Sequence, residues 1–118
     1  MPYVDGFVLV LPKKNLAAYT AMSKKCGKVW KEHGALQCRE CVGDDLAVKV
    51  GVAFPKRVAA KPGETVMFAW IAYKSRAHRD RVNAKVMKDP RIGKMITGKP
   101  PFDCTRMSFG GFKTVVDM

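Results

Sequence analysis

The sequence has no long hydrophobic run and no basic leader. Its longest uninterrupted apolar segment covers residues 66–73, whereas a membrane-spanning helix needs about 20 predominantly apolar residues. The first six residues, Met-Pro-Tyr-Val-Asp-Gly, include an acid and no lysine or arginine, which argues against a signal peptide. We therefore expect a cytoplasmic protein with no membrane partner, whose four cysteines are reduced thiols.

Acidic residues are also scarce, with 10 Asp and Glu against 22 Lys and Arg, a net charge of +12. Residues 13–33 hold six lysines and one glutamate, and residues 74–91 hold seven basic residues and two aspartates, which leaves +5 on each of two predicted helices. A solvated basic face explains this charge most simply. The alternative is weakly specific, salt-sensitive binding of nucleic acid (RNA). Its candidate residues are Lys24, Lys28, Arg81 and Lys85.

No internal repeat, low-complexity tract or linker interrupts the sequence. The 118 residues therefore indicate one domain, residues 1–118. The third strand of an RNA-recognition motif would begin with Lys or Arg followed by Gly and an aromatic residue. Residues 65–73 lack that pattern, so their aromatic side chains do not identify an RNA-binding sheet.

Apolar periodicity predicts the elements of the first half. Residues 3–11 are rich in Val, Phe and Leu and stop at Pro12, which is typical of a strand. Asn15 is expected to cap a helix that Gly34 ends in a left-handed conformation. Residues 35–42 then form a second strand. The apolar stripe of the helix consists of Tyr19, Met22, Cys26, Val29 and Trp30.

The second half contains a less regular segment and then a clear pattern. Residues 46–61 hold either a short strand or a single helical turn, and a turn at 61–64 leads into a strand at 65–73. Ser75 is expected to cap a second helix that ends near Lys88, and residues 92–97 form a short helical turn. The last strand covers residues 104–112, in which Gly110-Gly111 indicates a bulge or a close backbone approach.

The strand at residues 65–73 is the most informative segment, because neither of its faces is polar. Both faces must therefore be covered. Two long helices can cover one face of the sheet, and we expect a second copy of the chain to cover the other, as a sheet-to-sheet homodimer. Alternation assigns Val66, Phe68, Trp70 and Ala72 to one face and Met67, Ala69, Ile71 and Tyr73 to the other.

The element order is β-α-β-β-α-β, which predicts an α+β, ferredoxin-like domain: an antiparallel sheet with both helices on one face. Four stretches of sequence are distinctive together: residues 3–8; residues 34–36 with Glu40-Cys41; residues 70–91; and residues 101–103 with Arg106-Met107 and residues 110–112. Together they resemble the YbaA-like family of bacterial proteins, a domain of unknown function. The resemblance implies a dimeric α/β barrel, in which two ferredoxin-like sheets pack face to face. It implies no activity, because this architecture houses cofactorless monooxygenases, haem-degrading enzymes and small-molecule sensors alike.

Polar side chains within the strands and along the apolar side of the second helix are the candidate ligand-binding residues. Asp5 and Glu40 lie inside predicted strands, where each forms either a buried or interfacial salt bridge that fixes the geometry of the dimer or a general base or ligand anchor. Arg79 and Asn83 interrupt an apolar stripe and need partners in the protein or on a ligand. We expect a pocket between sheet and helices. Its candidate residues are Asp5, Glu40, Trp70, Tyr73, Arg79, Asn83 and Arg106.

The Cys38-Arg39-Glu40-Cys41 segment has the spacing of a redox or metal motif, but it lies within a predicted strand. Residues three apart in a strand point to opposite faces, so structural thiols are the favoured interpretation. A zinc site would need Cys26 and His33 as further ligands. His33 and His78 have no obvious carboxylate partner in the sequence, and we predict neither a metal nor a cofactor.

These observations favour a homodimeric protein that binds a small anionic or aromatic compound, or performs a minor enzymatic step on it. Nucleic-acid binding through the basic helices is the main alternative, and a purely interacting role is the third. The sequence identifies neither the ligand nor a catalytic residue, so whether the protein is an enzyme stays open.

Overall fold

A computed structural model describes the whole chain from Met1 to Met118, apart from the side chains of Ile96 and Thr97. Within this description, four strands form one antiparallel sheet in the order β2-β3-β1-β4. The strands are β1 (Tyr3–Pro12), β2 (Gln37–Val42), β3 (Glu64–Tyr73) and β4 (Ser108–Lys113). The helices are η1 (Lys13–Asn15), α1 (Leu16–Glu32), α2 (Phe54–Arg57), α3 (Arg76–Met87), α4 (Pro90–Thr97) and η2 (Cys104–Arg106).

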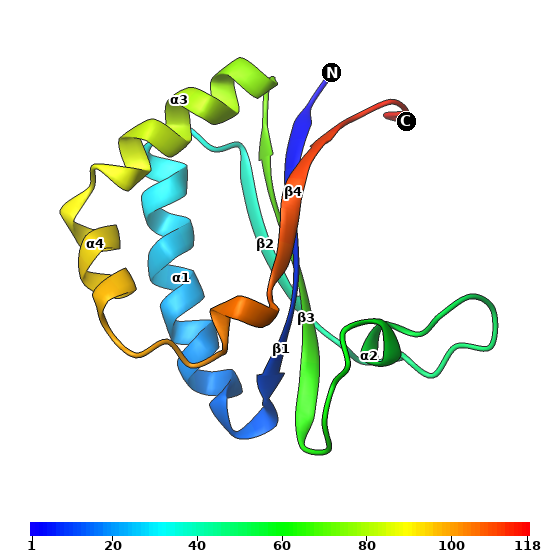
Figure 1. Cartoon of the computed structure of the whole chain (residues 1–118). Helices are drawn as coiled ribbons and strands as arrows, with labels where there is room; N and C mark the ends of the chain where they lie inside the picture. The colour runs from blue at the N-terminus through cyan, green and yellow to red at the C-terminus, as the bar shows by residue number, and fades with distance from the viewer.

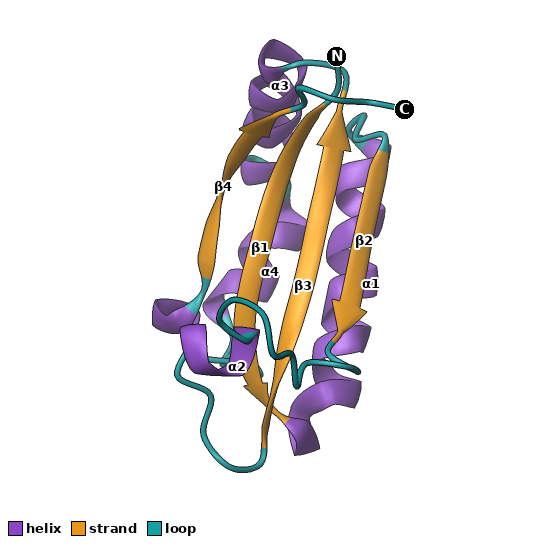
Figure 2. Ribbon diagram, turned by 90° about the vertical axis from the view of Figure 1, so that its right-hand side faces the viewer, coloured by secondary structure: helices purple, strands orange, loops and turns teal.

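Helices α1, α3 and α4 form a layer over one face of the sheet, which we call the helix face (Figure 1). The opposite, outer face carries only the segment between β2 and β3, with the short helix α2. Figure 2 shows this segment crossing in front of one end of β1 and β3. The predicted mixed α+β architecture with an antiparallel sheet is therefore confirmed. None of the described helices is both long and apolar enough to cross a membrane.

The core lies between the sheet and the helix layer, and strand alternation selects its members. Leu9 and Leu11 of β1 and Met67 and Tyr73 of β3 all point to the helix face. One core group consists of Val29, Ala35, Tyr73, Val82, Val86 and Ile92. The other consists of Leu9, Leu11, Tyr19 and Met67.

The two faces of β3 are both apolar, as predicted, but they are covered unequally. On the helix face Met67 and Tyr73 are buried, whereas on the outer face Phe68 is 45% exposed. Val10 and Val66 also belong to the outer face by alternation, and they are buried because the segment between β2 and β3 returns over that end of the sheet (Figure 2). No other segment in the described part of the chain covers the rest of the outer face.

Local signals set the ends of the helices, with one correction. Ser75 Oγ accepts a hydrogen bond from the backbone N–H of His78 at 3.1 Å, so the predicted cap of α3 is confirmed. Gly34 has a φ of +118°, as its place after α1 requires. Asn15 precedes α1, but its side chain donates to the carbonyl of Pro101 at 2.8 Å instead of capping the helix. The hydrogen bond to the distant Pro101 carbonyl thus replaces the expected bond to the first turn of α1.

The predicted last strand was too long at its beginning. Residues 104–106 form the 3₁₀ helix η2, because Asp103 Oδ1 accepts hydrogen bonds from the backbone N–H and the hydroxyl of Thr105. Pairing with β1 continues through Gly110 and Gly111 without a bulge. The close approach at Gly111 comes from the ring of Tyr3, which occupies the space that a side chain there would need.

One other strand boundary differs from the prediction, and one open alternative is decided by the structure. Strand β2 begins at Gln37, two residues later than the predicted start, because the backbone N–H of Ala35 still donates to the carbonyl of Trp30 in α1, at 3.0 Å. Of the two alternatives for residues 46–61, the structure has the single helical turn, α2.

Candidate functional site

One polar cluster lies between β1, β3 and the helix layer and contains four of the seven candidate residues: Asp5, Tyr73, Arg79 and Asn83. Its central contact joins Arg79 Nη1 of α3 to Asp5 Oδ1 of β1 at 2.7 Å. Asp5 is only 5% exposed. The Arg79 guanidinium also lies over the ring of Tyr3, 4.9 Å from its centre.

Asn83 completes this cluster from the next turn of α3. Its Oδ1 accepts hydrogen bonds from Tyr73 Oη at 3.2 Å and from Trp30 Nε1 at 3.1 Å. Burial raises the pKa of Asp5, and the nearby Arg79 partly offsets that rise. No buried polar side-chain atom among those described lacks a hydrogen-bond partner. The cluster therefore ties α3 to the sheet and leaves little capacity for a ligand.

The other three candidate residues lie elsewhere. Glu40 accepts a hydrogen bond from Tyr19 Oη at 2.9 Å, which connects β2 to α1. Arg106 holds Glu64 through two hydrogen bonds, at 2.7 and 3.0 Å, beside a small hollow of about 310 Å³. Trp70 lies on the outer face, because alternation along β3 separates it from Tyr73. The expected set of seven residues thus does not form one pocket.

A larger hollow, of about 600 Å³, lies on the outer face of the sheet instead of between sheet and helices. Gly6 and Gly110 are paired opposite each other on β1 and β4, and because both lack side chains they form its floor. A Cβ atom built on Gly110 would meet nothing within 4 Å. On the helix face, large side chains such as the fully buried Tyr73 fill the space between the sheet and the described helices. The outer-face side chains that form its walls are Val4, Val8, Phe68, Trp70 and Phe112; Phe7 and Phe109 also border it, but they pair with each other on the helix face.

Sequence reasoning missed Gly6 and Gly110 as site residues, although a signal was present. Glycine is unfavourable inside a strand, and where it occurs it often marks a place that a ligand or another chain approaches closely. The pattern around Gly110 suggested only a bulge or a close backbone approach. The pairing of the two glycines requires the register between β1 and β4, which the sequence does not display.

The edge of the hollow near β2 is polar. Trp70 Nε1 donates a hydrogen bond to Gln37 Oε1 at 2.9 Å, which fixes the plane of the indole. The Arg39 guanidinium lies 5.7 Å from the centre of that ring. No carboxylate among the side chains described forms an ion pair with Arg39. An aromatic wall beside an uncompensated cation suits an aromatic or apolar anion.

The cysteines are distributed between the two faces. Cys38 packs on the helix-face core, and its thiol lies 3.9 Å from the carbonyl of Gly27. Cys41 is paired opposite Phe68 and shares the outer face with it. Cys26 contacts Met95 through sulfur at 3.3 Å. No three His, Cys, Asp or Glu side chains in the described part of the chain gather closely enough to hold a metal ion.

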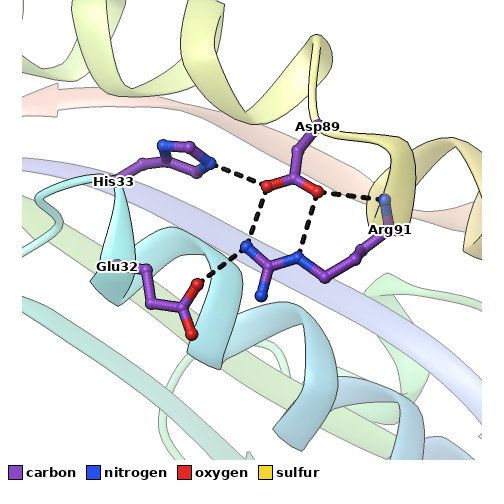
Figure 3. Close-up of polar contacts among 4 residues, drawn as sticks. All are labelled: Glu32, His33, Asp89 and Arg91. Atoms are coloured by element: carbon purple, nitrogen blue, oxygen red, sulfur yellow. Dashed lines mark hydrogen bonds and ion pairs between the residues drawn. The ribbon is translucent and has the colours of Figure 1, made fainter.

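His33 finds a carboxylate partner that the sequence did not reveal, since the partner is distant along the chain. Its Nε2 lies 2.9 Å from Asp89 Oδ2, and Arg91 bridges Asp89 and Glu32 at 2.8 and 2.7 Å (Figure 3). Asp89 also accepts a hydrogen bond from the backbone N–H of Arg91 and so caps α4. These contacts hold the end of α1 against the junction of α3 and α4.

Replacing Asp5 by Asn tests the buried carboxylate through pH. Because its pKa is raised in the folded state, folded Asp5 binds its proton more tightly than the unfolded chain does, and stability falls as pH rises above the ordinary value of 3.8. Asp5→Asn removes this titration. We therefore expect the difference in free energy of unfolding, variant minus wild type, to increase as pH rises through this range. Urea titrations at several pH values measure this difference. Asp117→Asn, in the exposed C-terminal segment, is the control, and a flat difference for Asp5→Asn would contradict the assignment.

Comparison with known proteins places the chain in a family. It is 41% identical over 117 residues to "Uncharacterized protein YbaA" of Escherichia coli strain K12, with 99% of each chain covered, and equally to the protein of that name from Shigella flexneri. A solved structure, "De novo designed protein Foldit4", aligns over 97% of this chain and 99% of its own with 9% identity and a TM-score of 0.47, too distant a likeness to carry weight. Residues 2–104 match the family described as "Protein of unknown function (DUF1428)". The chain therefore belongs to this family.

Proposed function

We propose that this chain is a ferredoxin-like, cytoplasmic domain that forms a homodimer through the outer face of its sheet, and that the hollow on this face binds a small aromatic or apolar anion. The order of the main elements, β1-α1-β2-β3-α3-β4, and the antiparallel sheet support the ferredoxin-like classification. Two such sheets packed face to face would form the dimeric α/β barrel.

Exposed aromatic side chains support the dimer. Phe112 of β4 is 64% exposed and Phe68 of β3 is 45% exposed. Both lie on the outer face and line the hollow there. Scattered apolar residues are normal on a protein surface, but a contiguous patch of large ones marks a binding surface. A second copy would cover it with an equivalent apolar surface.

The hollow itself is the observation that carries the ligand proposal. Its glycine floor provides room, its walls are apolar, and Trp70 provides a flat surface on which an aromatic ring can stack. Arg39 lies over the same indole and supplies a positive charge at the edge. Among the described residues that line the hollow, Ser108 is the one hydroxyl. This composition favours binding over catalysis.

The dimer predicts a molar mass about twice the 13.1 kDa of the chain in light scattering. Phe112→Asp should give a monomer, because an unpaired charge buried at an interface costs roughly 3–5 kcal/mol. Met87→Asp is the matched control, since Met87 is 59% exposed on α3, on the other side of the molecule. A wild type that is monomeric at micromolar concentration would rule out the dimer.

Two dyes of the same skeleton test the ligand site. Anilinonaphthalene sulfonate carries an anionic group, and N-phenyl-1-naphthylamine is its uncharged counterpart. Arg39→Gln should weaken binding of the sulfonate about tenfold, the equivalent of one charge-assisted hydrogen bond, and leave the uncharged dye unaffected. Arg81→Gln, an exposed arginine of α3, is the control.

Filling the hollow provides the second test of this site. Gly110→Val should abolish binding of both dyes without loss of stability, because the added side chain enters open space and valine favours strands. If Gly110→Val dissociates the dimer and leaves dye binding unchanged, the hollow is only a contact between copies.

RNA binding through the basic helices is the second candidate. Lys24, Lys28, Arg81 and Lys85 are all exposed on α1 and α3, away from the outer face. Non-specific phosphate contacts of this kind bind in the ~10⁻⁴–10⁻⁶ M range and weaken steeply with salt. We expect only such weak binding in filter assays at physiological salt. Nanomolar binding that disappears when the four residues are changed to Gln would make RNA binding the better proposal.

A further inference from the structure

One exposed segment has a composition that its surroundings do not explain. Residues 47–52, which we call the arm, read Ala-Val-Lys-Val-Gly-Val, and all six are exposed. Val48, Val50 and Val52 are 53%, 91% and 48% exposed. Three valines at alternate positions are the pattern of a strand with one apolar side, yet the arm has no strand partner within the described chain.

The arm is held at both ends and projects between them. Before it, the backbone N–H of Gly43 donates to Val66 of β3 at 2.8 Å, and after it Phe54 of α2 packs edge-on against Phe68. The one described backbone hydrogen bond that the arm itself makes is local, from Val48 to Leu46. Figure 1 shows the segment leading to α2 extending away from the sheet, on the side opposite the helix layer.

The arm and the hollow lie toward opposite ends of the outer face. The arm follows the end of β2 and precedes the start of β3, at the end of the sheet where Val10 and Val66 are already covered. The hollow reaches the other end, at Val4 and Phe112. Each copy therefore presents a projection at one end of its outer face and an empty surface at the other.

Only one face-to-face arrangement makes these features complementary. If the symmetry axis ran along the strands, the two arms would meet at the same end and hold the sheets apart. If the axis lies in the interface and runs across the strands, each arm faces the empty end of the other sheet, as the self-complementary surface of a twofold dimer requires.

We propose that the arm of each copy docks on the hollow of the second copy, in a dimer whose strands run antiparallel across the interface, and thereby closes the ligand site. The inference rests on the homodimer of the proposed function and adds its geometry. The site of one copy is then incomplete without the valines of the other. A second copy is the occupant because the projection and the empty surface belong to the same face of the same chain.

Val50→Asn and Lys49→Asn form a matched pair of variants. The dimer dissociation constant of Val50→Asn should rise at least about tenfold in sedimentation equilibrium, because the variant removes a buried apolar side chain from both arms. Lys49→Asn should change it less than twofold, because an exposed lysine keeps its charged head in water and contributes little apolar surface to an interface. Folding is checked by circular dichroism, and neither exposed position should alter it.

Cross-linking distinguishes the two arrangements directly. In a background with Cys41→Ser and Cys104→Ser, Val50→Cys protein is mixed with Lys113→Cys protein and treated with a short bismaleimide. We expect cross-links between these two proteins and none between two copies of Val50→Cys. Cross-links between two arms would overturn the proposed arrangement.

The outcomes separate this inference from the one it rests on. A monomeric wild type would refute both the homodimer and the arm. A dimer that Phe112→Asp dissociates and Val50→Asn leaves unchanged would refute the arm alone. Weaker binding of anilinonaphthalene sulfonate to Val50→Asn, at concentrations where the variant is still dimeric, is the expected sign that the partner's arm closes the site.

Discussion

The structure depends on one constraint: the central strands β1 and β3 are apolar on both faces, and the helices cover only one of them. Burying apolar surface is the main favourable contribution to folding. On the helix face this surface is buried, by residues such as Leu11 and Tyr73 that are fully enclosed. On the outer face, apolar surface is buried only where the segment between β2 and β3 crosses one end. The remaining apolar surface is what any account of function has to explain.

The polar residues between the sheet and the helices serve this same packing. Asp5 and Arg79 pair across β1 and α3, and Asn83 receives hydrogen bonds from Tyr73 and Trp30. A buried carboxylate is costly unless it is paired and hydrogen-bonded, and here it is both. Such a network fixes how α3 sits on the sheet. In the sequence these residues resemble an active site, because a polar residue on an apolar stripe looks the same whether it binds a ligand or pairs within the protein.

Most of the fold was predictable because its signals are local. Ser75 caps α3, Gly34 ends α1, and apolar runs rich in β-branched and aromatic residues mark β1 and β3. Local signals misled where a distant group competed for the same atoms. Asn15 has the composition of a cap, but the carbonyl of Pro101 takes its side chain. The start of the last strand was missed for a different reason, a local one: Asp103 turns residues 104–106 into a 3₁₀ helix before the strand begins.

The candidate site was less predictable, because it depends on which residues meet across strands. Gly6 and Gly110 form the floor of the hollow only through the register of β1 with β4, and Arg39 reaches Trp70 only through that of β2 with β3. Seven polar or aromatic candidates were expected in one pocket, and four of them meet. Alternation alone places Trp70 on the other face from Tyr73.

By itself, the sequence determined the elements, the two apolar faces of β3 and the family, because periodicity and identity are properties of residues in order. Tertiary structure alone decided that the open face is the one with the glycine pair, that His33 has Asp89 as a partner, and that the arm projects beside the outer face. The physical reason is that strand register and helix docking join residues far apart in the chain. Such pairings are selected by the packing of the whole domain and not by any neighbouring residues.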